Sequence, residues 1–191
     1  MSLNVLIIMP SVVKDRTELH TNVDEKLILP VIKRVQDIYV MPLLGSTLFN
    51  KIITNINANT LSGNYQTLVD NFLIDIVCNY VMAELPASLN AQFWNAGVSI
   101  KNTENGQTLQ GNEIKKIQDN YRQYAGHYAQ RAKRYLQQNA NTLFPEYYQM
   151  VAGIDVVVPE SNVFDCPIDI GTKEIFIKPQ PSYNDPQQHN L

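Results

Sequence analysis

The sequence predicts a mainly α-helical protein: a bundle of about four helices with an inserted β-hairpin and an extended, partly β C-terminal tail. Three observations lead to this fold class. Apolar residues recur every three or four positions over much of residues 24–139, as they do on one face of a helix. The stretch FWNAGVSIKNTENGQT interrupts this pattern with a short alternating run and an Asn-Gly pair. After residue 150 short β-type runs lead into a polar end that is rich in proline.

The same changes of pattern divide the chain into segments. We expect residues 1–20 to form an extended N-terminal arm and residues 21–149 to form the helical bundle, with the hairpin inserted at about 93–110. Residues 150–191 form the tail. A chain of 191 residues is long enough for one such domain with a substantial core.

The first two helices are predicted from caps, spacing and stop signals. Thr21 or Asn22 can cap the first helix, and Pro42 and Gly45 end it. Ser46 or Thr47 can cap a second, shorter helix. The apolar face of the first helix is expected at Leu27, Val31, Val35, Ile38 and Tyr39.

Two longer helices follow. The third runs from about 65 to 85, ends at Pro86 and places Phe72 in the core, where Phe72→Ala would cost about 3–5 kcal/mol. The fourth covers about residues 112–139. Its apolar seam is expected at Ile114, Ile117, Tyr121, Tyr124 and Tyr128.

The inserted hairpin is interpreted as an element of contact. Gly97 permits a tight exit from Trp94, Val98 and Ile100 share one face, and the Asn-Gly pair at 105–106 favours a turn with positive φ. An isolated two-stranded hairpin is marginal in water, so we expect it to lie against a neighbouring subunit. The interface residues of this hypothesis are Trp94, Gly97, Val98 and Ile100.

The tail is expected to become ordered only against a partner. Its β-type runs at 156–158 and 175–177 offer edges to which a partner could add a strand. The candidate interface residues are Val156, Val158, Ile175 and Ile177.

Charge is unevenly distributed along the chain. The net charge of −3 and the pI of about 5.6 argue against a dedicated nucleic-acid-binding domain, which is usually basic. The fourth predicted helix nevertheless carries six basic residues against two acidic ones, and the tail is acidic. The basic residues are candidate contacts for DNA or an acidic partner: Lys115, Lys116, Arg122, Arg131, Lys133 and Arg134.

No motif for catalysis, phosphate binding or metal binding is found in the sequence. The two cysteines cannot provide a disulfide framework or a four-ligand metal site, and Cys78 is expected to be a buried thiol. We therefore expect no enzymatic activity, no cofactor and no metal. The apolar stretch at residues 3–9 is too short to span a bilayer and no basic segment precedes it. We expect a protein that is made in the cytoplasm and binds no membrane.

The order of these features resembles the head–tail connector, or adaptor, proteins of tailed bacteriophages, especially crAss-like and other phages of gut Bacteroidetes. The resemblance covers about residues 24–148 and lies in PLLG with LF at 42–49, NAGV at 95–98, YL at 135–136 and FPEY at 144–147. It implies a virion protein of the neck, assembled in the host cytoplasm as a dodecameric ring. Such a ring docks beneath the portal protein, meets the next tail component and continues the DNA channel without reading DNA sequence.

Two alternatives stay open at this point. One is a tail-completion or assembly module that acts through protein–protein contacts as a monomer. The other is a DNA-binding protein that uses the basic helix. Molecular mass distinguishes the first alternative from a ring, and salt-dependent retention on DNA would favour the second.

Overall fold

The computed structural model describes residues 5–94, 97–100, 111–149 and 156–159. All of these residues belong to one compact unit, residues 1–160. Within it the chain forms five helical rods, because two of the rods continue from α-helix through a π-helical turn into α-helix without a break.

The first rod is α1 (Pro10–Arg16), and the second joins α2 (Glu25–Val35), η1 (Gln36–Val40) and α3 (Met41–Leu44). The third is α4 (Ser46–Asn57). The fourth joins α5 (Gly63–Leu68), η2 (Val69–Leu73) and α6 (Ile74–Asn90), and the fifth is α7 (Gly111–Leu143), followed by the short 3₁₀-helix η3 (Pro145–Tyr147). Strands β1 (Ala91–Trp94) and β2 (Gly97–Ile100) pair in antiparallel fashion at the end of α6.

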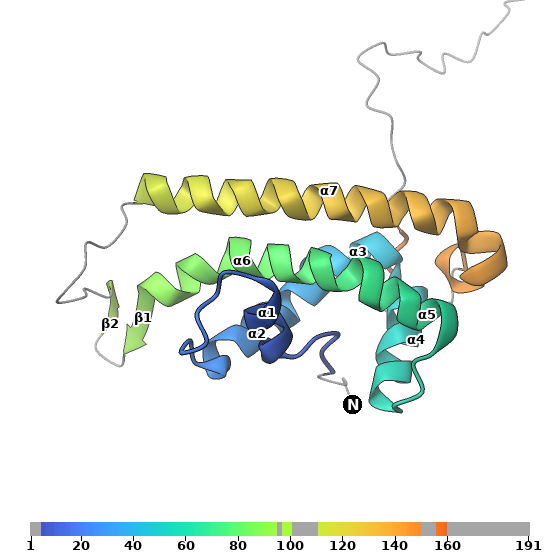
Figure 1. The fold of residues 1–191 in the computed structure, drawn as a ribbon, viewed down its shortest axis with the longest axis horizontal. Coiled ribbons are helices and arrows are strands. Elements are labelled where there is room, and N and C mark those ends of the chain that lie inside the picture. Colours follow the sequence, from blue (N-terminus) through green and yellow to red (C-terminus); the bar gives the residue numbers. More distant parts are fainter. Residues whose placement is uncertain (1–4, 95–96, 101–110, 150–155, 160–191) are drawn as a thin grey trace, which may run out of the picture. The chain divides into compact units, whose positions relative to one another are not determined.

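The rods pack in layers around α6. Helix α7 lies along one side of α6, and α1 and α2 lie on its other side (Figure 1). Helix α4 contacts η3, the short helix that follows α7, so the C-terminal end of α7 is connected to α4. The long central rod therefore contacts apolar partners on two opposite sides, which explains why so much of its surface is apolar.

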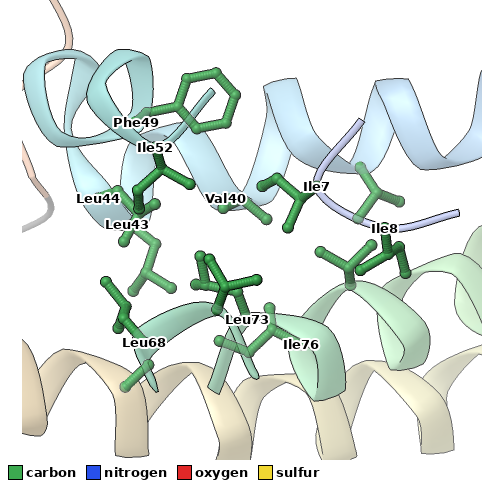
Figure 2. Packing of buried hydrophobic residues seen from close by; sticks show 14 of the residues in the cluster. Ile7, Ile8, Val40, Leu43, Leu44, Phe49, Ile52, Leu68, Leu73 and Ile76 are labelled. Carbon is green, nitrogen blue, oxygen red and sulfur yellow. The ribbon is translucent and has the colours of Figure 1, made fainter. Parts of the chain in front are cut away.

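The core lies between the central rod and the helices that precede it in sequence. Figure 2 shows Leu44 and Ile52 of α3 and α4 on one side, and Leu68, Leu73 and Ile76 of the α5–α6 rod on the other. Nearly all of these side chains are fully buried. Burying each such aliphatic side chain contributes roughly 1.5–3 kcal/mol, so this layer supplies much of the driving force for folding.

Helix α7 packs on α6 through small residues. The fully buried positions of α7 are Ala125, Ala132, Leu136 and Ala140, which step by seven and then by four residues along one face. The predicted seam is therefore wrong at two positions: Ile117 is 38% exposed and Tyr124 is 55% exposed, whereas Tyr128 packs partly buried against the core. Alanine can be buried at a close helix contact without a polar group to satisfy, whereas tyrosine keeps its hydroxyl near water.

The N-terminal segment is part of the fold, and the predicted extended arm is wrong from residue 7 onward. Ile7 and Ile8 are buried, and α1 places Val13 in the core with 0% exposure. The buried Gln36 holds this segment, since its Oε1 accepts from the Ile7 N–H at 2.7 Å and its Nε2 donates to the Val5 carbonyl at 3.2 Å. An amide side chain satisfies a buried donor and acceptor together, as an apolar residue could not.

The predicted fold class is wrong about the hairpin. The structure is mainly helical, and its only described strand pairing is the four-residue β1–β2 pair. Trp94 is opposite Gly97, so 97–100 is the return strand of this pairing rather than the outgoing one. The short run after α6 is local pairing at a helix end. The Asn-Gly pair at 105–106 lies outside the described residues.

The predicted partly β tail is also wrong in its described part, residues 156–159. Residues 156–159 form no strand, and Ile175 and Ile177 lie outside the described residues. The prediction that the tail becomes ordered only against a partner is wrong for residues 156–159, because Val157 hydrogen-bonds to Ser46 of the same chain. The backbone of Val157 bonds to Ser46 at the start of α4 rather than to a strand.

Helix ends and faces differ from prediction at several other positions. Pro86 lies inside α6, which continues to Asn90, and the cap of α2 is Asp24, whose side chain accepts from the Lys26 N–H at 2.9 Å. Phe72 is only partly buried, because it lies at the surface edge of the α7 contact. Ile38 is 54% exposed, since η1 rotates the following residues relative to α2.

Candidate functional site

The predicted hairpin interface falls on the β1–β2 pair. The backbones of Trp94 and Gly97 are paired, Phe93 is opposite Val98, and Ala91 is opposite Ile100. The side chains of these residues lie outside the described part of the structure. Their contact role stays a prediction, and in the described residues the predicted projecting hairpin is replaced by the short pairing of 91–94 with 97–100.

The predicted basic residues all lie on α7 but do not form one patch. Arg122 is engaged inside the chain by Glu84 at 3.2 Å and Asp119 at 3.3 Å. The guanidinium of Arg131 lies 4.8 Å from the centre of the Phe72 ring, a cation–π contact. The others are spread along the helix, since Lys115 and Lys133, and likewise Lys116 and Arg134, lie on the same side but about five turns apart.

Tyrosine–glutamate hydrogen bonds tie the end regions of the unit together. The Tyr121 hydroxyl of α7 donates to Glu18 at 2.5 Å, and the Tyr65 hydroxyl of α5 donates to Glu146 in η3 at 2.8 Å. The Tyr39 hydroxyl donates to Glu84 at 2.9 Å, and its ring stacks on Tyr80. These bonds lie at helix contacts rather than in a cleft, so they serve packing geometry.

Burial, and after it the hydrogen bond to Glu146, raises the pKa of Tyr65 from the ordinary value of 10 to about 12, and burial with the bond to Glu18 does the same for Tyr121. A raised folded pKa stabilises the protein fully below pH 10, and this contribution is lost as the pH rises through 12. We expect the free energy of unfolding to fall over this window. Denaturant unfolding between about pH 9 and pH 12 measures it.

The matched control for the alkaline effect is the double variant Tyr65→Phe and Tyr121→Phe. The variant lacks both tyrosine hydroxyls but keeps the aromatic rings, so its stability should depend less steeply on pH over the same range. Equal pH dependence of the parent and the variant would contradict the assignment.

One exposed apolar surface surrounds the start of α4. The Ser46 N–H donates to the Val157 carbonyl at 2.9 Å, the Val157 N–H donates to Ser46 Oγ at 3.2 Å, and Thr47 Oγ1 donates to the Gln149 carbonyl at 2.8 Å. These bonds attach residues 149 and 157 to Thr47 and Ser46, which lie more than one hundred positions earlier in the sequence. The exposed apolar residues that flank them, Tyr148, Val156 and Val158, are here named the corner patch.

A second exposed apolar surface lies on the N-terminal half of α7. Ile117 and Tyr124, here named the α7 stripe, are seven residues apart and so lie on the same side of the helix. This half of α7 runs over the end of α6 from which β1 continues, away from α4 and α5 (Figure 1). The α7 stripe and the corner patch therefore occupy different elements of the unit.

Sequence reasoning missed the corner at Gly45 and Ser46. Gly45 has φ +75° and ψ 154°, and a Cβ built there would lie 2.7 Å from Pro159 Cδ and Cγ. Gly45 was interpreted only as a stop signal, although a glycine between two helices also indicates a positive φ. The approach of Pro159 had no signal in the sequence.

The described residues offer little for catalysis. They contain no group of three or more His, Cys, Asp or Glu side chains that could hold a metal ion. Cys78 is buried, as predicted, and burial raises the pKa of its thiol to about 12, which keeps it protonated and unreactive.

One helical stretch of the described chain, Gly63–Leu89, is long and apolar enough to cross a membrane on length and composition alone. A core helix has the same properties. In this structure the stretch packs against α2 and α7.

The fold and its surfaces define a helical-bundle protein whose described surface carries exposed apolar side chains. Comparison with known families matches residues 40–150 to a family of unknown function, DUF6712. The match covers more than half of the chain, so the protein belongs to this family. No curated protein and no solved structure matches the chain.

Proposed function

We propose that this protein is a structural subunit of a phage neck, which assembles as a closed ring beneath the portal protein and joins the capsid to the tail. The observation that carries the proposal is that exposed apolar side chains lie on separate elements of the unit, among them the α7 stripe and the corner patch. A closed ring in which each copy meets the next head to tail requires two different surfaces on every subunit.

The sequence resemblance to head–tail connectors supports the same proposal. It extends over the bundle from about residue 24 to 148 and includes the PLLG motif that ends at the Gly45 corner. The partners of such a ring are further copies of the chain, the portal protein and the next tail component. DNA would pass through the ring without sequence readout, because basic side chains spread along a helix suit phosphates, which carry no sequence information.

The test changes the α7 stripe. Ile117→Ser combined with Tyr124→Ser should lower the melting temperature only slightly, because Tyr124 is 55% and Ile117 is 38% exposed in the single subunit. The same change should abolish the ring-sized particle, because each copy loses its apolar contact. Mass photometry of concentrated protein, alone and with portal protein, measures the particle.

The matched control is Gln123→Ser combined with Gln130→Ser, which alters two exposed polar residues on the outer side of α7. It should assemble like the parent protein. A parent protein that stays monomeric both alone and with portal protein would contradict the proposal and favour a monomeric assembly module.

A further inference from the structure

The outward side of α7 carries a continuous row of exposed polar residues. Helix α7 buries Ala125, Ala132, Leu136 and Ala140, and its opposite side faces solvent. Along that side exposed residues recur at steps of three and four positions, which is the spacing of one helix face. The row, here named the polar row, begins at Lys116, ends at Asn141 and passes through Asn120, Gln123, His127, Gln130, Arg134 and Gln138.

The polar row contains neither a carboxylate nor an apolar side chain. Its members are lysine, arginine, histidine, asparagine and glutamine residues. The two acidic residues of α7 lie elsewhere, because Glu113 precedes the row and Asp119, on its flank, pairs with Arg122 at 3.3 Å. From Lys116 to Asn141 the row is about 37 Å long, at a rise of about 1.5 Å per residue.

Interactions inside the chain leave basic rather than acidic side chains without a partner. Of the described carboxylates only Asp15 and Asp70 make no ion pair or hydrogen bond. Several basic side chains of α7 make none within the described residues: Lys115, Lys116, Lys133 and Arg134. The charge left uncompensated in the described part is therefore mainly basic, and a surface of this sign is complementary to a polyanion.

Duplex DNA fits the polar row better than an acidic protein does. Protein interfaces depend on buried aromatic or aliphatic anchors, and the row has none. Phosphate oxygens instead accept hydrogen bonds from lysine, arginine, asparagine and glutamine side chains, which make up nearly all of the row. The length of the row is close to one helical turn of the duplex, about 34–36 Å.

We propose that the polar row of α7 is the surface of each subunit that lies along the phosphate backbone of double-stranded DNA. Lys116 and Arg134 supply the charge, and the amide side chains between them donate hydrogen bonds to phosphate oxygens. Arg122 contributes less, because Glu84 and Asp119 engage it within the chain. The proposal rests on the proposed function, since it names the side of the subunit that faces the DNA in the ring.

The test measures binding of the full-length protein to a fluorescein-labelled duplex of mixed sequence, roughly 30 base pairs or three helical turns long. Fluorescence anisotropy gives the affinity at salt concentrations between about 50 and 200 mM. Lys116→Gln combined with Arg134→Gln should weaken binding and reduce the slope of log affinity against log salt by about 1.8. Each lost phosphate contact contributes about 0.9 to this slope.

The matched control is Lys26→Gln combined with Arg34→Gln. Both residues are exposed on α2 and their side chains make no ion pair or hydrogen bond within the described residues, so the control removes the same charge from another element. Its salt slope should equal that of the parent protein. An equal loss in the control, or a parent protein that shows no salt-dependent binding to the duplex, would overturn the proposal.

Fluorescein-labelled polyglutamate is the second probe, since it carries negative charge without phosphates. The parent protein should bind it more weakly than the duplex. Tighter binding of polyglutamate, lost in the variant of Lys116 and Arg134, would show that the polar row accepts an acidic peptide and would overturn the assignment to DNA.

Mass photometry of the same proteins separates this proposal from the ring itself. Ring-sized particles that do not bind the duplex would leave the ring standing and overturn the assignment of the polar row. Duplex binding that depends on Lys116 and Arg134, with no ring alone or with portal protein, would support the assignment and contradict the ring.

Discussion

Phe144→Ala is expected to lower the free energy of unfolding by about 3–5 kcal/mol, the typical cost of removing a buried aromatic side chain. Phe144 follows α7 and is 0% exposed. Its ring meets Tyr65 and Tyr135 edge to face, with centroids 5.6 and 5.9 Å away. Removing it leaves a cavity where the end of α7, α5 and η3 meet. Urea unfolding followed by circular dichroism gives the difference.

Phe72→Ala is the matched control for this prediction. Phe72 also contacts Tyr135, with centroids 4.5 Å apart in a stacked arrangement, but it is only partly buried and lies beneath Arg131 at the surface. Its loss should cost about 1–2 kcal/mol, because water can fill the space that it leaves. A larger loss at Phe72 than at Phe144 would contradict this account of the core.

Gly45→Ala is expected to destabilise the protein by about 1–3 kcal/mol from backbone strain alone, because φ +75° with ψ 154° is a conformation that only glycine adopts readily. The added methyl would also displace Pro159, whose Cδ and Cγ lie 2.7 Å from the Cβ position. The variant should therefore lose stability and release the segment at 156–159. Thermal melting and limited proteolysis after residue 149 measure the two effects separately.

Substitutions at two other glycines distinguish the backbone strain at Gly45 from the steric clash with Pro159. Gly63 has φ +60° with nothing within 4 Å of its Cβ position, so Gly63→Ala should show the strain alone, about 1–2 kcal/mol. Gly126 lies inside α7 with open space around it, and Gly126→Ala should stabilise the protein by about 0.5–1 kcal/mol. Equal effects at all three positions would contradict the special role of the corner.

Local pattern predicted the existence of the long helices, because an apolar step of three or four residues is a property of each segment by itself. The missed helix α1 also carries a local signal. Pro10 stands at its first turn and Lys14 and Arg16 stand in its last, a distribution that suits the helix dipole. The prediction of an extended arm gives this signal no weight, and a helix of seven residues is stabilised mainly by packing.

The candidate surfaces were predictable only in part. Val156 and Val158 were nominated from their β-type run and are exposed, but the run pairs with a helix start instead of a strand. The spacing of three and four residues predicts that the two residues of the α7 stripe lie in a buried seam, but both are exposed. Which face of a helix is buried depends on what packs against it, and that information lies in α6 rather than in α7.

The sequence by itself determined that this protein is mainly helical and that Cys78 is a buried thiol. Only the tertiary structure decided which residues meet across long separations. Gln36 holds a segment some thirty positions earlier, and Gly45 lies beneath a proline more than one hundred positions later. Helix formation follows from interactions between residues three and four apart, whereas these contacts exist only once the packed rods bring the backbones together.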